Sequence, residues 1–188
     1  GVMCRGGDAT MCNARHARVA QARAGGSSDL GRTTNTLGLN DRKSDELVAA
    51  GLTGVVLSLE GPTLHDEIRG VPGNTRKVLR NLDHFRATAP DLRINLALTL
   101  MGINLGDVMA AVDLARDKGV SLFLNLIDNG TYFFRGIAAS LFEIPDRAAF
   151  DRLIDDLIAV KLDEPDLLGN SVASLEYARR YFADPKQA

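Results

Sequence analysis

GVVLSLEGP, residues 54–62, is the stretch that decides the fold of this chain of 188 residues. Gly54–Leu59 is an apolar run of strand length that ends in small and polar residues. Such a run, bounded by turn residues, is typical of a strand buried on both faces of a parallel sheet. Glu60 follows the strand directly, and a carboxylate in that place predicts a polar site at the end of the strand.

Strands and helices alternate in both directions from this stretch. The predicted strands are Gly1–Arg5, Asp29–Thr33, Gly54–Leu59, Arg93–Leu100 and Val120–Ile127. The predicted helices are Asn13–Ala24, Asp41–Ala50, Asn74–Ala87, Asn104–Lys118, Asp146–Val160 and Ser171–Phe182. Asn74 is expected to cap its helix, and Asn104 and Asp107 are expected to cap theirs as a pair. The alternation predicts an α/β fold with parallel strands and right-handed crossovers.

The chain is predicted to have two parts. Residues 1–140 hold all five predicted strands, and residues 141–188 form a helical extension without a strand. The segment between Asp8 and Asp29 is rich in Arg and lacks acidic residues, as a transit peptide is. The strand pattern of Val2–Cys4 just before it favours an exposed helix rich in Ala and Arg instead. Because the chain opens on a strand pattern without an initiator Met, we expect natural sequence before Gly1.

Composition excludes several classes of function. Hydrophobic residues make up 45% and charged residues 24% of the chain, and the net charge is −2. Nothing in this balance predicts a nucleic-acid or membrane partner. The apolar runs are too short to span a bilayer. With two cysteines the chain is no disulfide scaffold, and we expect a reducing, cytoplasmic location.

Polar and small residues recur after the predicted strands, at the edge where parallel α/β folds bind ligands. They are Gly6, Gly7, Asp8, Thr34, Asn35, Ser58, Glu60, Gly61, Thr99, Asn125 and Asp128. Together they predict a polar ligand with hydroxyl and ammonium groups. The chain has no dinucleotide-binding glycine motif, P-loop or nucleophile elbow. Its three histidines have no metal-ligand spacing, and His65 is expected to be a solvated loop residue.

In this order the features resemble the radical S-adenosylmethionine (SAM) enzymes. The block Ser58–Gly70, with its Ser-Leu-Glu-Gly-Pro start, is similar to the family's fourth strand and following loop. Gly6-Gly7-Asp8 resembles the Gly-Gly-Glu motif of its second strand, and Thr33-Thr34-Asn35 the end of its third. Leu98-Thr99-Leu100 with Asn104 resembles its fifth strand and the helix start that follows.

The resemblance runs from Val2 to Ile127 and implies a fold. That fold is a partial (β/α)6 TIM-like barrel of parallel strands that lacks the first strand and continues into the C-terminal helices. Ser171–Phe182 is similar to the helix that leads, in some members, into an auxiliary-cluster domain of the SPASM type.

The resemblance also implies which residues bind the cofactor SAM. Gly6 and Gly7 would let the backbone approach its methionine part. Asp8 would accept hydrogen bonds from its ammonium, and Arg69 would pair with its carboxylate. Ser58 and Glu60 would hold the ribose hydroxyls, because a carboxylate can accept two hydrogen bonds. Asn35 and Thr99 would line the site, and Leu126 would touch the adenine. Turn, cap, strand or surface roles are the alternatives for each polar residue.

One departure from the family limits the activity of this chain. Members hold a [4Fe–4S] cluster with three cysteines in C-x-x-x-C-x-x-C spacing, and the chain has no such motif. We therefore expect a truncated chain that cannot cleave SAM alone. The complete enzyme would carry the cluster, take an electron from a donor, and generate a 5′-deoxyadenosyl radical that abstracts hydrogen from an unknown substrate.

Two other functions stay open from the sequence. The first is a non-catalytic SAM-binding or interaction domain that has lost its cluster. The second is an unrelated barrel enzyme such as a phosphate-binding lyase, which is disfavoured because no lysine or glycine-rich phosphate loop follows a strand.

Overall fold

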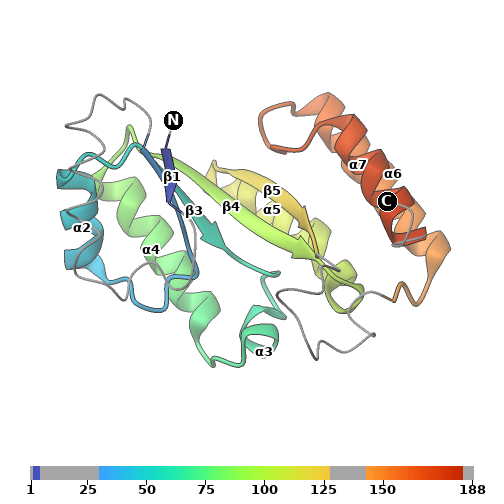
Figure 1. Ribbon diagram of the computed structural model, residues 1–188, viewed down its shortest axis with the longest axis horizontal. Coiled ribbons are helices and arrows are strands. Elements are labelled where there is room, and N and C mark those ends of the chain that lie inside the picture. Colours follow the sequence, from blue (N-terminus) through green and yellow to red (C-terminus); the bar gives the residue numbers. More distant parts are fainter. Residues whose placement is uncertain (1, 5–29, 128–142, 184–188) are drawn as a thin grey trace. The chain divides into compact units, whose positions relative to one another are not determined.

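The computed structural model describes residues 2–4, 30–127 and 143–183 of the chain (Figure 1). The predicted helix Asn13–Ala24 lies outside these residues. The chain divides into two compact units, one of residues 1–59 and 65–97, the other of residues 60–64 and 98–188. The predicted boundary between residues 140 and 141 stays a prediction, because it falls outside the described residues.

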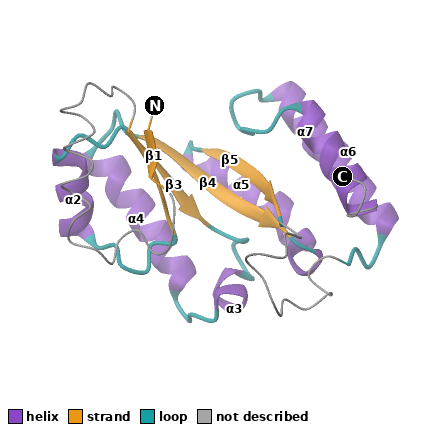
Figure 2. Cartoon of the chain, in the orientation of Figure 1, coloured by secondary structure: helices purple, strands orange, loops and turns teal. Residues whose placement is uncertain are grey.

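Parallel strands form the sheet (Figure 2). They are β1 (Val2–Cys4), β2 (Leu30–Thr34), β3 (Gly54–Ser58), β4 (Arg93–Leu100) and β5 (Ser121–Leu126), and their order in the sheet is their order in the chain. The first unit contains β1 to β3 and β4 as far as Ala97, and the second contains the end of β4 and β5. This confirms the predicted α/β class with parallel strands.

The two faces of the sheet differ in chemistry. In the first unit Thr34, Leu57 and Leu96 share one face through their register, and both leucines are fully buried. The opposite face carries Ser58 and Asn95, which are half-buried. Since side chains alternate along a strand, the leucine face packs against helices and leaves the second face for polar groups. The predicted alternation along Arg93–Leu100 is therefore confirmed.

Helices α2 (Asp41–Ala49) and α4 (Asn74–Thr88) of the first unit pack side by side, and α4 contacts β3 (Figure 1). Asn40 caps α2 by accepting a hydrogen bond from the Lys43 N–H at 3.0 Å. The predicted cap of α4 was wrong. Gly73, with a φ of 80°, begins α4, and Asn74 is a buried residue inside its first turn. The carboxylate of Asp66 accepts from the N–H groups of Gly73 at 2.5 Å and Thr75 at 2.6 Å, so it satisfies donors of the first turn in place of a cap by Asn74.

The described residues of the second unit form four helical elements: the 3-10 helix η1 (Gly102–Asp107), α5 (Val108–Lys118), α6 (Arg147–Asp163) and α7 (Val172–Ala183). Asp146 caps α6 through the Ala149 N–H at 2.9 Å. The predicted capping role of Asp107 was wrong, because its carboxylate makes no cap hydrogen bond to α5. Within the described residues no helix is both long and apolar enough to cross a membrane.

A short segment after α6 covers the free edge of β5. Leu122 pairs in parallel with Leu168, although the sequence predicted no strand character beyond residue 140. Asn170 continues the pairing with its side chain. Its Oδ1 accepts from the Leu124 N–H at 2.7 Å and its Nδ2 donates to the Leu124 carbonyl at 2.9 Å. An uncovered strand edge invites pairing with other chains, so this segment protects the edge of β5.

We expect Asn170→Ala to destabilise the second unit. Asn170 is 7% exposed, and its loss leaves the buried N–H and C=O of Leu124 without partners. Each unsatisfied group costs about 1–3 kcal/mol, so the loss of both should lower the free energy of unfolding by about 2–6 kcal/mol. Urea denaturation measures this loss. Glu176→Ala, at a solvent-facing position of α7, is the control, and an equal loss in both variants would contradict the role of Asn170.

Candidate functional site

The predicted site residues are distributed over both units. Asn35, Ser58 and Arg69 belong to the first unit, and Glu60, Thr99 and Leu126 belong to the second. Gly6, Gly7 and Asp8 lie outside the described residues, so their predicted roles stay predictions.

Asn35 and Ser58 occupy matching positions at the ends of two neighbouring strands of the first unit. Thr34 pairs with Leu57, and Asn35 and Ser58 are the next residues along β2 and β3. Both side chains are half-buried. The Asn35 Oδ1 accepts from the Leu37 N–H at 3.2 Å, which is an Asx turn. Ends of parallel strands therefore bring an amide and a hydroxyl to the same edge, as the sequence predicted.

Thr36 is a residue of this edge that the sequence analysis missed. Its φ is 64°, a left-handed conformation that costs a β-branched residue about 1–2 kcal/mol. The side chain is fully buried, and its hydroxyl has no hydrogen-bond partner among the described residues. The Thr34 hydroxyl accepts from the Thr36 N–H at 3.0 Å and fixes the turn. Strain and an unpartnered hydroxyl at a strand end are typical of ligand sites. The only sequence signal for Thr36 was its position directly after Asn35, beyond the end of a predicted strand.

The predicted solvated loop histidine is wrong, because His65 is fully buried at the start of the short helix α3 (His65–Arg69). Its Nε2 lies 2.7 Å from the Asn74 Nδ2, which can only donate. Burial, and secondarily the charge of Arg69, lowers the pKa of His65 from 6.5 to about 4. The ring is therefore neutral at pH 7 and joins α3 to α4. Arg69 itself is exposed at the end of α3.

Glu60 is a buried carboxylate of the predicted set, with 3% of its surface exposed. Its Oε2 accepts from the Thr99 N–H at 2.7 Å. Asn104 holds the same two residues from their backbones, because its Nδ2 donates to the carbonyls of Glu60 at 3.0 Å and Thr99 at 2.9 Å. The Asn104 Oδ1 also accepts from the Met101 N–H at 2.9 Å. The second unit thus brings Glu60 and Thr99 together as predicted.

Asp107 shapes the loop after Glu60. Its carboxylate accepts from the N–H of Thr63 at 2.8 Å, from the Thr63 hydroxyl at 2.7 Å and from the N–H of Leu64 at 2.9 Å. Gly61 has a φ of 128°, and a Cβ there would lie 2.8 Å from the Cβ of Asp107. Only glycine fits, so the Glu-Gly pair of the sequence is a requirement of this packing.

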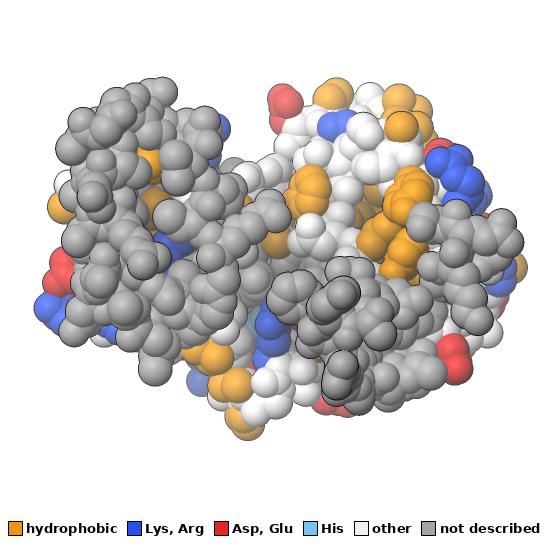
Figure 3. All heavy atoms as spheres, in the orientation of Figure 1, with side chains coloured by type: hydrophobic (Ala, Val, Ile, Leu, Met, Phe, Trp, Pro, Cys, Tyr) orange, Lys and Arg blue, Asp and Glu red, His pale blue; other side chains and the backbone are white. Residues whose placement is uncertain are grey.

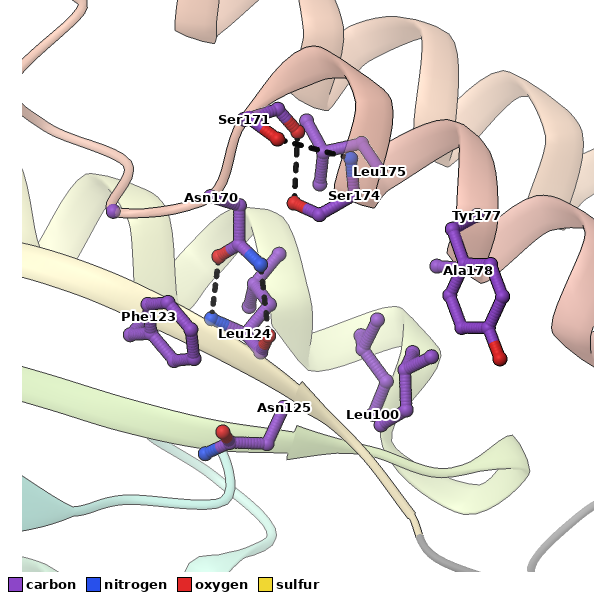
Figure 4. A pocket seen from close by; sticks show the side chains of 12 residues that line it. Leu100, Phe123, Leu124, Asn125, Asn170, Ser171, Ser174, Leu175, Tyr177 and Ala178 are labelled. Atoms are coloured by element: carbon purple, nitrogen blue, oxygen red, sulfur yellow. Dashed lines mark hydrogen bonds between the residues drawn. The ribbon is translucent and has the colours of Figure 1, made fainter.

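Leu126 lines a pocket of about 460 Å³ that lies wholly within the second unit (Figure 4). Its walls come from the end of β4, from β5, and from the segment Gly169–Ala178. Phe123 and Asn125 stand on β5, and Tyr177 descends from α7 (Figure 4). The sequence analysis named Leu126 as a binding residue and Asn125 among the polar residues at the strand ends. The others were missed because α7 and β5 are far apart in the chain.

No protein-family model matches the chain, and no curated protein matches it in sequence. Solved structures match its fold. Streptococcus suis SuiB bound to S-adenosylmethionine superposes with a TM-score of 0.65 at 14% identity, over 88% of this chain and 36% of that one. AnSMEcpe with bound AdoMet gives 0.55 at 18% identity, over 72% and 38%.

A third match is a domain of the pyruvate-formate lyase-activating enzyme from Bacteroides vulgatus. Its TM-score is 0.61 at 14% identity, over 89% of this chain and 96% of that domain. These proteins are radical SAM enzymes, so the fold of this chain is that of a radical SAM core and the predicted resemblance is confirmed for the fold. The chain spans little more than a third of the SuiB and anSMEcpe structures.

Among the described residues, no group of three or more His, Cys, Asp or Glu side chains is placed to hold a metal ion. The whole chain has two cysteines, and three thiolates are needed to hold the family's [4Fe–4S] cluster. The residues of this chain therefore do not fit the cluster.

Replacing Gly61 with Ala should destabilise the chain by about 2–4 kcal/mol, because backbone strain and the contact with Asp107 add together. Gly70→Ala is the matched control. Its φ is also positive, 62°, but an added Cβ meets nothing within 4 Å. It should cost only about 1 kcal/mol. Equal losses in chemical denaturation would show that Asp107 does not constrain the loop.

His65 predicts a pH dependence of stability. Its pKa is lowered in the folded chain, so the unfolded chain binds more protons between pH 6.5 and about 4. Stability is thus complete above pH 6.5 and falls as the pH drops towards 4. His65→Gln, which keeps a hydrogen-bond acceptor for Asn74, should flatten this fall in the urea midpoint between pH 6.5 and 4.5. His84→Gln is the control and should retain it, and a His65→Gln chain that is as pH-sensitive as the parent would refute the assignment.

Proposed function

We propose that this chain is the SAM-binding core of a radical SAM enzyme. In the complete protein, a [4Fe–4S] cluster and an electron donor would generate a 5′-deoxyadenosyl radical that abstracts hydrogen from a substrate. The strongest support is that the chain combines this fold with polar residues at the end of a central strand. The fold is shared with SAM-bound proteins. Ser58 is the last residue of β3 and Glu60 comes two residues later, where a polar ligand would bind.

The residues suit SAM, which supplies an activated methionine and a ribose with two hydroxyls. The Glu60 carboxylate uses one oxygen for the Thr99 N–H, and carboxylate oxygens retain further lone pairs for hydroxyls. In the first unit, Ser58 and Asn35 carry a hydroxyl and an amide at the strand ends, and the buried Thr36 hydroxyl has no hydrogen-bond partner among the described residues. Asn104 and Asp107 touch neither ribose nor adenine in this proposal and position the loop that carries Glu60.

The chain alone should not perform the chemistry. With two cysteines it cannot supply three thiolates, so no step of SAM cleavage is assigned to its residues. We expect no 5′-deoxyadenosine after anaerobic reconstitution and reduction of the chain. A non-catalytic SAM-binding domain is the alternative that the missing motif favours. An in-frame C-x-x-x-C-x-x-C upstream in the native transcript would favour the enzyme, and its absence would favour the binding domain.

Isothermal titration of the chain with SAM tests the binding that both alternatives share. We expect saturable binding that Glu60→Gln weakens about tenfold, because the amide offers one acceptor oxygen in place of two. Glu60→Gln keeps an acceptor for the Thr99 N–H, so the loop should keep its shape.

Glu67→Gln is the matched control, since Glu67 is exposed on α3 and has no place in the proposed site. It should bind SAM as the parent does. Absence of SAM binding to a folded chain would overturn the proposed function, and equal binding by both variants would remove Glu60 from it.

A further inference from the structure

Among the described residues, none of those that line the pocket between β5 and α7 carries a charged side chain. Its polar lining consists of the side chains of Asn125, Asn170, Ser171, Ser174 and Tyr177, and the rest is apolar. A volume of about 460 Å³ is within the range of sites for small ligands. A charged ligand would lose its hydration here without gaining a counter-ion, so the lining favours a neutral one.

Asn170, which lines the same pocket, shows that a side-chain carboxamide can bind the N–H and the C=O of one peptide residue. Its amide binds both the N–H and the C=O of Leu124 at 2.7 and 2.9 Å, as a neighbouring peptide strand would (Figure 4). Asn125 is the next residue of β5, and its side chain is exposed in the pocket lining. An asparagine amide carries the same donor and acceptor pair as a peptide group. Asn125 therefore offers this bidentate pairing to an extended peptide unit.

Large apolar side chains stand beside this amide. Phe123 is 43% and Tyr177 39% exposed, which is unusual for aromatic residues of a core sheet and its covering helix. Leu100, buried at the end of β4, forms part of the same lining. Hydrophobic side chains also reach the visible surface of the described residues in the space-filling view (Figure 3). An aromatic or aliphatic side chain of a ligand would bury this apolar surface.

We propose that this pocket binds an uncharged segment of a peptide, in which Asn125 pairs with a backbone amide and Phe123 and Tyr177 enclose an apolar side chain. The inference rests on the proposed function in one respect: the bound segment is taken to be the enzyme's substrate. The hydroxyls of Ser171 and Ser174 are already engaged in the first turn of α7. The Ser171 hydroxyl accepts from the Ser174 N–H at 3.1 Å, and the Ser174 hydroxyl donates to the Ser171 carbonyl at 2.8 Å.

Nuclear magnetic resonance of the full chain with the capped peptide acetyl-Ala-Phe-Ala-amide tests the proposal. The side-chain amide signals of Asn125, assigned by their loss in Asn125→Leu, should shift saturably, whereas those of Asn170 should not. Acetyl-Ala-Glu-Ala-amide should bind at least tenfold more weakly. Asn125→Leu and Tyr177→Ala should each weaken binding of the neutral peptide about tenfold, judged from the remaining signals of the pocket.

Leu162→Ala is the control, because Leu162 is 70% exposed on α6 and does not line the pocket. Unchanged spectra away from the pocket would show that each variant is folded. Three results would overturn the inference: no saturable shift, equal binding of both peptides, or contacts in the free chain that place residues 128–142 against Asn125. SAM titration of the same sample separates the two ideas, since SAM binding without peptide binding removes this inference alone.

Discussion

The hydrogen bonds of Asn104 are the constraint around which the candidate site of the second unit is built. This fully buried amide joins the carbonyl of Glu60 to the carbonyl of Thr99 and accepts from the Met101 N–H. In a dry interior each of these groups would be costly to leave unpaired. The loop that begins at Glu60 and the end of β4 are therefore fixed to one another, and the Glu60 carboxylate is turned to the Thr99 N–H. Asp107 completes the loop from the other side, and its approach is the reason that Gly61 must be glycine.

The strands that hold these residues have one apolar face that packs in the core and a second face that carries candidate ligand-binding side chains. In β4, residues Ile94, Leu96, Leu98 and Leu100 are at most 6% exposed, which places the packing face of the strand against helices. The alternate positions include the polar residues Asn95 and Thr99, which are half-buried, and the small Ala97. In β5 the alternate positions are Phe123 and Asn125, which line the pocket of the second unit. The same period of two that builds the core thus supplies the groups that would meet a ligand.

Sequence patterns predicted the regular parts of this chain because those parts depend on local periodicity. The alternation along Arg93–Leu100 and the helix predicted over Asp146–Val160 need only neighbouring residues to be recognised. Predictions that depend on distant partners were wrong or absent. His65 is buried because Asn74 and α4 cover it. The Asp107 carboxylate does not cap α5, because it accepts instead from Thr63 and Leu64, about forty residues earlier in the chain. The pairing of Asn170 with Leu124 spans 46 residues, which no local pattern can indicate.

The central claim is that SAM binds at Glu60 and Thr99, beside the end of β4. Hydrogen–deuterium exchange of the chain, with and without saturating SAM, tests it most directly. The account predicts slower exchange in residues 58–64 and 98–104 and little change in α2 or α6, which lie outside the proposed site. Uniform exchange in both samples, or protection confined to helices away from these strand ends, would contradict it.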